Sequence, residues 1–503
     1  MSEYEVTVLK DGGEEQRIAA PGGALFLQLL KGNGYPLVCC NGKGGCGRCR
    51  IRFPDGNAPL PSPADRNALT AEELREGIRL ACVHRVKRDC RIRVEFVQPK
   101  QIEILAGSAG SVHIGYPEGS AAATENENAA AALNGEPYVL AVDLGTTTIV
   151  ANAMPIAMFQ RNPDGVPVLA AAGRMNPQRQ WGSDVISRIQ AAVAGAGKEL
   201  QEVVRSAVSE LAEDIAEQMG ALPERICLAG NTVMEHLFLG WDVRGLGEYP
   251  FRPVSLKEQE TEIFLNSGGR QRAYPLRLLP GISAFVGADV LAGLLICGFG
   301  NPQDSRCRLF IDLGTNGEMA IGNGERLICT ATAAGPAFEG GANANVPGTD
   351  MIALLARLLR EGKIDRTGLL RDDLFEEGWQ EDGVRLTQRD IRALQVAKAA
   401  VCAGVELLMQ RLGVGCCDVA EVYLAGGFGC YLDVGSAAEI GLFPAELSGK
   451  VRAVGNTSVL GAAFYGAVPG LPERAEALAR SAEVMNLAEE PGFEERYLER
   501  MGF

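Results

Sequence analysis

The sequence predicts a small α+β domain followed by a larger α/β domain built from two similar halves. Three features predict this arrangement. Short strands flank a cysteine-rich loop near the N-terminus, residues 98–136 have low complexity, and one strand–turn motif occurs at Asp143 and again at Asp312. A chain of 503 residues is long enough for each domain to have a core of its own.

The cysteine-rich loop carries the strongest chemical signal in the chain. Cys40, Cys46 and Cys49 stand as Cys-x5-Cys-x2-Cys, and Cys82 follows later. Four thiolates can hold a [2Fe–2S] cluster, and glycines between them allow backbone N–H groups to approach the sulfurs. The alternative is a structural zinc site, which normally shows two Cys-x2-Cys pairs, whereas this segment has one. The pattern therefore favours an iron–sulfur cluster.

Strands and a helix surround this loop. Tyr4–Leu9 alternates as a strand, Gln16–Ala20 pairs with it, Gly23–Gly32 encloses a short helix, and Arg91–Phe96 forms a late strand. This element order resembles the β-grasp fold of ferredoxins, and the cysteine spacing resembles the adrenodoxin-like branch of that family.

Bulk composition narrows the class of protein. The hydrophobic fraction of 47% is that of a globular protein, and 14 cysteines without a secretory signal indicate reduced thiols. We therefore expect a cytoplasmic protein that neither spans a membrane nor, with a net charge of −15, binds nucleic acid. Residues 1–100 hold 16 Lys and Arg against 12 Asp and Glu, so a cationic domain precedes an acidic body.

Domain boundaries follow from changes in composition. The sequence predicts a domain over 1–97 and a flexible linker over 98–136. The larger domain covers 137–470, with halves at 137–306 and 307–470, and a C-terminal tail covers 471–503. Helices are expected at 184–219, 283–297, 388–412 and 457–467 from apolar spacing.

The two halves repeat motifs in the same order. Tyr138–Thr148 is an apolar strand that ends in Asp-Leu-Gly-Thr, and Arg308–Glu318 repeats it. Ile226–Thr232 in the first half corresponds to Val422–Gly429 in the second. Matching motifs in the same order indicate two homologous α/β subdomains that face each other.

The chemistry of these turns suits a nucleotide. An Asp at a strand tip can hold Mg²⁺ through water, glycine lets the backbone approach a phosphate, and threonine supplies neutral donors. The expected phosphate-binding residues are Gly145, Thr146, Thr147, Gly314, Thr315 and Asn316. The turn with Gly426, Gly427 and Gly429 lacks bulk and suits close approach to adenosine.

Residues 138–467 resemble the superfamily of ATPases that includes acetate and sugar kinases, heat-shock chaperones and actin (ASKHA). Its phosphate 1, phosphate 2 and adenosine motifs match Asp143–Thr148, Asp312–Glu318 and Gly426–Gly429. The chain as a unit resembles the reductive activators of corrinoid proteins, with further family-like segments at Leu228–Met234, Pro280–Asp289 and Ala334–Gly341.

The resemblance implies an enzyme that couples ATP hydrolysis to reduction of a corrinoid cobalt from Co(II) to Co(I) through a [2Fe–2S] cluster. The cobalt couple lies very low, whereas a plant-type cluster sits near about −400 mV. Each ~100 mV of deficit costs about 2.3 kcal/mol for one electron, which is why nucleotide would be needed. The implied partners are a corrinoid protein of a methyltransferase system and a low-potential electron donor. Homodimer formation stays open.

Two alternatives remain at this level: a redox-gated small-molecule kinase, and a ferredoxin fused to a nucleotide sensor. The expected cofactors are the cluster, ATP and Mg²⁺. Asp143, Asp312, Glu318 and Glu339 are the candidate catalytic or Mg²⁺-ordering carboxylates. For Asp289 a structural and a catalytic role are both open.

Overall fold

The structure is a computed structural model. It describes residues 3–9, 15–35, 37, 49–69, 71–95, 136–161, 166–267, 270–314, 316–332, 348–381, 384–426 and 432–503. The chain divides into two compact units, one made of residues 1–102 and 177–194 and the other of residues 103–176 and 195–503. Nearly all of the expected linker lies outside the described residues.

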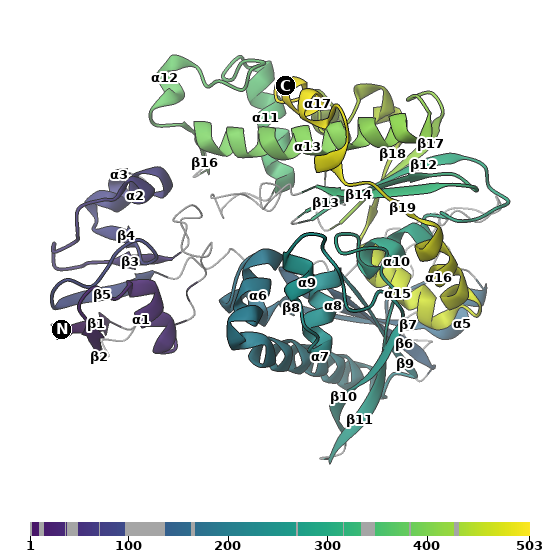
Figure 1. Cartoon of the computed structure of the whole chain (residues 1–503), viewed down its shortest axis with the longest axis horizontal. Coiled ribbons are helices and arrows are strands. Elements are labelled where there is room, and N and C mark those ends of the chain that lie inside the picture. The colour runs from purple at the N-terminus through teal and green to yellow at the C-terminus, as the bar shows by residue number, and fades with distance from the viewer. Residues whose placement is uncertain are drawn as a thin grey trace. The chain divides into compact units, whose positions relative to one another are not determined.

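The N-terminal unit contains a five-stranded mixed sheet in the order β2-β1-β5-β3-β4 (Figure 1). Its strands are β1 (Glu3–Leu9), β2 (Glu15–Pro21), β3 (Arg50–Arg52), β4 (Ile78–Leu80) and β5 (Cys90–Glu95). β1 pairs antiparallel with β2 and parallel with β5. The predicted ferredoxin-like order of elements is therefore confirmed.

Three short helices accompany this sheet: α1 (Phe26–Gly32), α2 (Pro63–Ala68) and α3 (Ala71–Arg75). Alternate residues of β1, Val6 and Val8, are fully buried and meet Leu30 of α1 in one core. α2 begins with a capping box, in which Ser62 and Asp65 satisfy each other's backbone N–H groups. The core of this domain therefore forms from its own residues.

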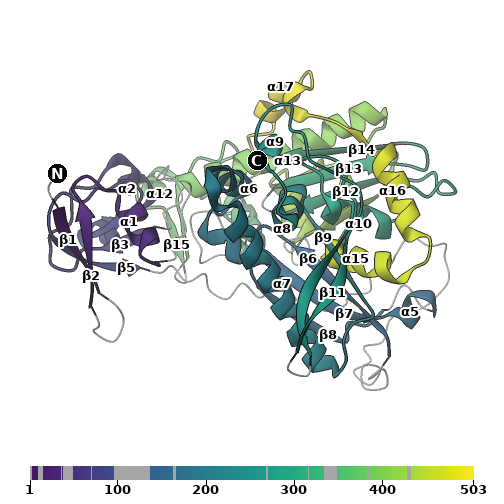
Figure 2. The same ribbon diagram turned by 60° about the horizontal axis from the view of Figure 1, so that its bottom comes forward.

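The second unit contains two six-stranded sheets with the same internal plan (Figure 2). The first has the order β10-β11-β9-β6-β7-β8, and the second β18-β17-β12-β13-β14-β19. In each, an antiparallel meander of three strands is joined by a parallel strand: β9 beside β6, and β17 beside β12. This shared topology confirms the predicted duplication. The strand bounds are β6 (Tyr138–Leu144), β7 (Thr148–Pro155), β8 (Ala170–Met175), β9 (Arg225–Gly230), β10 (Gln259–Ser267), β11 (Arg270–Leu278), β12 (Cys307–Leu313), β13 (Gly317–Gly322), β14 (Leu327–Thr332), β17 (Val419–Ala425), β18 (Val451–Gly455) and β19 (Glu483–Val484).

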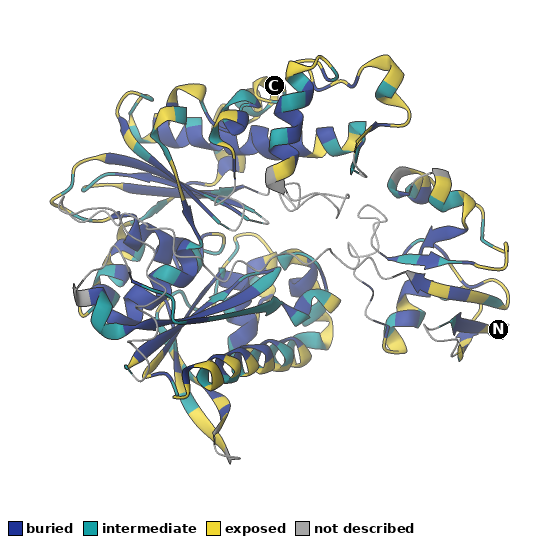
Figure 3. Cartoon of the chain, turned by 180° about the vertical axis from the view of Figure 1, so that it is seen from behind, coloured by how far each residue is buried: buried dark blue, intermediate teal, exposed yellow. Residues whose placement is uncertain are grey.

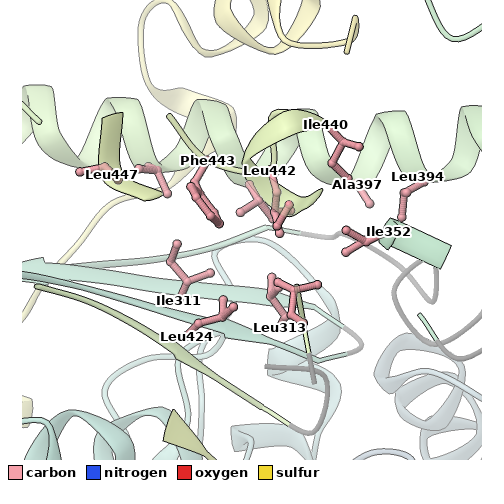
Figure 4. Packing of buried hydrophobic residues seen from close by; sticks show 14 of the residues in the cluster. Ile311, Leu313, Ile352, Leu394, Ala397, Leu424, Ile440, Leu442, Phe443 and Leu447 are labelled. Carbon is pink, nitrogen blue, oxygen red and sulfur yellow. The ribbon is translucent and has the colours of Figure 1, made fainter. Parts of the chain in front are cut away.

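Helices cover both faces of the second sheet. Alternate residues of β12, such as Ile311 and Leu313, pack with α13 in one core (Figure 4). Phe310, which points to the opposite face of the same strand, packs in another core with α10 and α15. Burial on both faces explains why the middle of the strand, Leu309, Phe310 and Ile311, is apolar at successive positions. The helices of the unit are α5 (Ile156–Arg161), α7 (Gly197–Met219), α8 (Thr232–Leu239), α9 (Arg244–Gly247), α10 (Ala288–Ile296), α11 (Gly348–Arg360), α12 (Asp372–Phe375), α13 (Gln388–Leu412), α14 (Val434–Glu439), α15 (Thr457–Ala467), α16 (Leu471–Ser481) and α17 (Phe493–Glu499), with a small hairpin β15 (Trp379–Glu381) and β16 (Val384–Leu386).

α10 and α15 cross between the two sheets at unusually close range. A Cβ atom at Gly461 would lie 2.3 Å from the carbonyl oxygen of Ala292, and one at Gly293 would lie 2.6 Å from Thr457 Oγ1. Glycine is required at both positions because the helices could not approach so closely with any larger side chain. The core around this crossing includes Val139 from the first sheet and Tyr423 from the second.

Two helices differ from the prediction: one is interrupted and the other begins later than expected. The helix expected over 184–219 is divided by a π-helical segment at Ala192–Ala196, where Gly195 has φ +112°. The helix expected from 283 begins only at Ala288, after a glycine-flanked loop. α7 is straight after the break, and in Figure 3 one of its faces is buried and the other exposed.

Residues 471–503, expected as a tail, are folded onto the larger unit, where α16 packs against α10 and α15. β19 pairs parallel with β14, and α17 packs on α13. Gln395 of α13 is buried and donates a 2.7 Å hydrogen bond from Nε2 to the carbonyl of Met501. The spacing of Leu471, Ala475 and Leu478 already showed an apolar helix face, which the composition of the surrounding segment obscured.

Candidate functional site

The two repeated aspartates occupy equivalent places in the two sheets. Asp143 lies in β6 beside Ala229 of β9, and Asp312 lies in β12 beside Ala425 of β17. Each is followed by one more strand residue and then a glycine turn. The predicted phosphate turns therefore emerge from the same point of the repeated fold.

The glycines at the ends of the parallel strands β9 and β17 also match. A Cβ atom at Gly230 would lie 2.9 Å from the carbonyl oxygen of Leu144, and one at Gly426 would lie 2.5 Å from that of Leu313. Gly426 has φ +93°, and its added Cβ would also lie 2.6 Å from Asp312 Oδ1. Gly426, the first residue of the turn predicted to approach adenosine, is therefore packed directly against the end of β12, where the second phosphate turn begins.

Two asparagines brace the first phosphate turn. Asn176 Nδ2 donates to the carbonyl oxygen of Gly145 at 2.9 Å, and its backbone N–H donates to Thr147. Asn231 Nδ2 donates to Thr146 Oγ1 at 2.9 Å, while its Oδ1 caps α8. Asn231 lies in a segment that the sequence had singled out. Asn176 belongs to no motif in the sequence. It directly follows β8, and the pairing of β8 with β7 brings it next to the turn.

Asp143 is held by two side chains from a distant segment. Asn456 Nδ2 donates to its Oδ2, and Ser458 Oγ donates to its Oδ1, each at 2.8 Å. Burial raises the pKa of Asp143, and these two hydrogen bonds oppose that rise. Sequence reasoning missed both donors, since neither belongs to a recognisable motif.

Glu318 faces Asp312 across the β12–β13 ladder, where the two residues form a register pair. Glu318 is buried, and burial followed by the charges of Asp289 and Asp312 raises its pKa well above the ordinary value. Like charges opposite each other destabilise a sheet, so such a pair indicates a functional site rather than a structural one. The structure therefore brings together two of the predicted catalytic carboxylates.

Asp289, in the first turn of α10, lies close enough for its charge to act on Asp312 and Glu318, and we call these carboxylates the acidic group. Burial, and the charge of Asp143, raise its pKa to about 7, and burial with the charges of Asp289 and Asp143 raises the pKa of Asp312 to about 8. Glu235 of α8 is a further member, and one of its oxygens is buried without a hydrogen-bond partner. Sequence reasoning left Asp289 open and did not select Glu235.

This acidic group fits a Mg²⁺–nucleotide complex better than a cation held by protein alone. Within the described ranges, no set of three His, Cys, Asp or Glu side chains is close enough to hold a metal ion directly. Mg²⁺ commonly keeps several waters and binds through one or two carboxylates and the phosphates of a substrate. Burial and, after it, the charges of neighbouring carboxylates raise these pKa values, and a cation bound in this way would offset both effects.

Two of the four predicted cluster ligands lie in the described part of the N-terminal domain. Cys49 precedes β3 and Cys82 follows β4, and both are buried. β3 and β4 are paired, and the N–H of Ala81 donates to the carbonyl oxygen of Cys49 at 2.7 Å, so the two cysteine segments are adjacent. This arrangement fits a group that takes several thiolates. Cys40 and Cys46 lie outside the described residues, as do Thr315, Gly427, Gly429 and Glu339.

Three family models match the chain. They are a 2Fe-2S iron-sulfur cluster binding domain over residues 9–87, the RACo middle region over 138–301, and the C-terminal ASKHA domain of RACo over 306–345 and 342–503. The corrinoid activation enzyme RamQ of Eubacterium limosum is 31% identical over 429 residues, which cover 72% of this chain and 69% of the relative. This chain belongs to the RACo family.

Two other proteins extend this likeness. The [Co(II) methylated amine-specific corrinoid protein] reductase of Methanosarcina barkeri is 23% identical over 385 residues, or 64% of the present chain and 68% of the reductase. A solved structure of a reductive activator for corrinoid, iron–sulfur protein aligns with a TM-score of 0.63 and 24% identity, covering 99% of this RACo-family chain and 98% of the other. The alignment with this solved structure confirms the fold, in which a ferredoxin-type domain is followed by an ASKHA domain.

No helix in the described ranges of this RACo-family protein is long and apolar enough to cross a bilayer. The long apolar stretch near residue 290 forms helix α10, and its residues are buried in the core between the two sheets.

Proposed function

We propose that this protein is an ATP-dependent reductive activator, which converts the cobalt of a partner corrinoid protein from Co(II) to Co(I). The observation that carries the proposal is the alignment with RamQ over 72% of the chain, combined with a duplicated site that gathers acidic side chains from both halves. The partner belongs to a methyltransferase system, and a low-potential donor supplies the electron.

The N-terminal domain is the electron-carrying part of this proposal. Cys40, Cys46, Cys49 and Cys82 hold a [2Fe–2S] cluster, and that cluster supplies one-electron transfer when bound. Cys49 and Cys82 are carried by segments that hydrogen-bond to each other, which supports their assignment as ligands of one centre.

The larger unit is the nucleotide-binding part. Gly145, Thr146, Thr147 and residues 314–316 contact the phosphates, and the turn at Gly426, Gly427 and Gly429 lies against adenosine. Asp143 and Asp312 would hold Mg²⁺ through water molecules, and Glu318 and Glu339 would orient the attacking water. The register pair of Asp312 and Glu318 supports the closeness that these roles need.

ATP is needed in this scheme because the electron moves uphill from a cluster near about −400 mV. Nucleotide binding can drive such a step only if it favours one of two states of the protein. Two halves that share one acidic site give such states, since a bound Mg²⁺–nucleotide complex attracts carboxylates of both halves toward itself.

The test is reduction of a purified Co(II)-corrinoid protein by the anaerobic, full-length chain with a chemical reductant. We expect the absorbance of the Co(I) form to appear only with ATP and Mg²⁺, and the corrinoid partner to stimulate ATP hydrolysis. Reduction that runs equally well without nucleotide would contradict the coupling. Stoichiometric phosphoryl transfer to a metabolite in the absence of corrinoid would support a kinase instead.

A further inference from the structure

The turn that joins β18 to α15 supplies both donors to Asp143. Asn456 Nδ2 bonds to one carboxylate oxygen and Ser458 Oγ to the other, so each oxygen has its own donor at 2.8 Å. The side chain of Asn456 cannot easily turn away, because its Oδ1 accepts from the N–H of Val459 and caps α15. The cap thus directs Nδ2 toward Asp143.

This turn joins a strand of the second sheet to a helix that packs against the first sheet. β18 pairs with β17 in the second sheet, whereas Val459 and Ala462 of α15 are buried in the core that also contains Val139 and Ala141 of β6. Asp143 belongs to the same strand β6. The two hydrogen bonds therefore tie a carboxylate of the first sheet to the end of a strand from the second.

The equivalent aspartate of the other half is held differently. Among the described residues, no side chain donates a hydrogen bond to Asp312, although it occupies the same position in its sheet. The duplication therefore does not account for the pair of donors on Asp143. Within the described part of the site, this pair of donors belongs to the first half alone and requires a specific reason.

We propose that Asn456 and Ser458 are positioning residues of the Mg²⁺–nucleotide site. They fix both oxygens of Asp143 before the ligand arrives, and they connect this carboxylate to the second half. The inference rests on the proposed function, because it assigns the two side chains a role in binding ATP and Mg²⁺. A carboxylate that is already oriented loses less conformational freedom on binding, and charge-assisted hydrogen bonds are strong enough to hold it.

Two variants remove the donors with little other change. Ser458→Ala deletes the hydroxyl, and Asn456→Ser removes Nδ2 but keeps an oxygen that can cap α15. Thr457→Val is the matched control, because Thr457 is buried between the two donors and its Oγ1 has no hydrogen-bond partner. All three substitutions leave the backbone and most of the local volume unchanged.

The measurement is calorimetric titration of the full-length protein with ADP, once with Mg²⁺ and once with a chelator. We expect each donor variant to bind Mg²⁺–ADP about tenfold more weakly, the effect of losing about 1.4 kcal/mol. We expect ADP without metal to change less than about twofold in these variants, because Asp143 acts through the metal and its waters. Thr457→Val should match the unsubstituted protein in both titrations.

Equal Mg²⁺–ADP affinity in all variants would overturn the inference, and so would an equal loss with and without metal, which would show a purely structural role. A comparable loss in Thr457→Val, or a large fall in melting temperature in the donor variants, would also count against it. Failure of the unsubstituted protein to bind any Mg²⁺–nucleotide would overturn the proposed function itself and this inference with it.

Discussion

His84 Nε2 lies 2.6 Å from Asp65 Oδ2 in the interior of the ferredoxin-type domain. Asp65 also accepts hydrogen bonds from the N–H of Leu80 at 2.8 Å and from the N–H and hydroxyl of Ser62. Burial alone would raise the pKa of Asp65, but these bonds outweigh it and lower the pKa to about 2. The carboxylate is therefore ionised and His84 donates to it. Leu80 and His84 stand two residues on either side of Cys82.

Replacement of Asp65 by Ala should destabilise the N-terminal domain by about 3–5 kcal/mol, because it leaves several buried donors without an acceptor. We also expect faster loss of the cluster, since the segment that carries Cys82 loses its anchor. Visible absorbance followed during guanidinium unfolding measures both effects. Asp55→Ala is a suitable control, as Asp55 is exposed and its 3.6 Å ion pair with Arg91 contributes little. Similar midpoints for the two variants would refute the anchoring role.

Gly426→Ala should weaken nucleotide binding more than tenfold, because its new Cβ would meet Leu313 and the Asp312 carboxylate at 2.5 and 2.6 Å. The matched control is Gly413→Ala, which has a similar positive φ of +79° but open space around the added atom. The control should lose only about 1 kcal/mol of stability from backbone strain and keep its affinity. Calorimetric titration with ATP compares them. Equal affinities would show that the crowding at Gly426 is harmless.

A substitution in the cluster site should leave nucleotide binding intact, and one in the nucleotide site should leave the cluster intact. The reason is that the N-terminal domain and the larger unit have separate cores. Cys46→Ser should bleach the visible absorbance and stop corrinoid reduction, while ATP affinity stays within about twofold of the original. Asp312→Ala should keep the visible spectrum and lose ATP-dependent reduction. Corrinoid reduction at full rate by the Asp312 variant would remove that carboxylate from the mechanism.

The acidic group predicts an unusual dependence of stability on pH. The pKa of Asp312 is about 8 in the folded protein and near 3.8 in the unfolded chain, and that of Asp289 is raised to about 7. Between these values the folded state holds protons that the unfolded chain has released, so the free energy of unfolding falls as pH rises from about 4 to about 8. Each carboxyl contributes at most about 1.4 kcal/mol per pH unit.

Denaturant unfolding of the nucleotide-free protein at several pH values measures this slope. Asp312→Asn, which cannot ionise, should show a shallower fall than the unsubstituted protein. Mg²⁺–ATP should reduce the slope as well, because a bound cation favours the ionised carboxylates. A profile that does not change in Asp312→Asn would mean that this carboxyl is ionised across the range.

Local features of the sequence predicted most of the architecture. The apolar runs ending at Asp143 and Asp312 mark buried strands, and the glycines after them mark turns, because side-chain periodicity and backbone freedom act over a few residues. The repeated order of these motifs was enough to predict two halves with one topology. Composition misled where it was the only guide: residues 471–503 are polar overall, yet they form a helix whose apolar face packs against α10 and α15 and a strand that pairs with β14.

By itself, the sequence determined the ferredoxin-type and ASKHA domains and the repeated strands, and it predicts the phosphate turns and the four cysteine ligands. Only the tertiary structure decided which side chains reach them. Asn456 is 313 positions from Asp143, and no spacing rule connects the two. They meet because two sheets pack around the crossing of α10 and α15, an arrangement that depends on the combined packing of the entire core and not on any one segment.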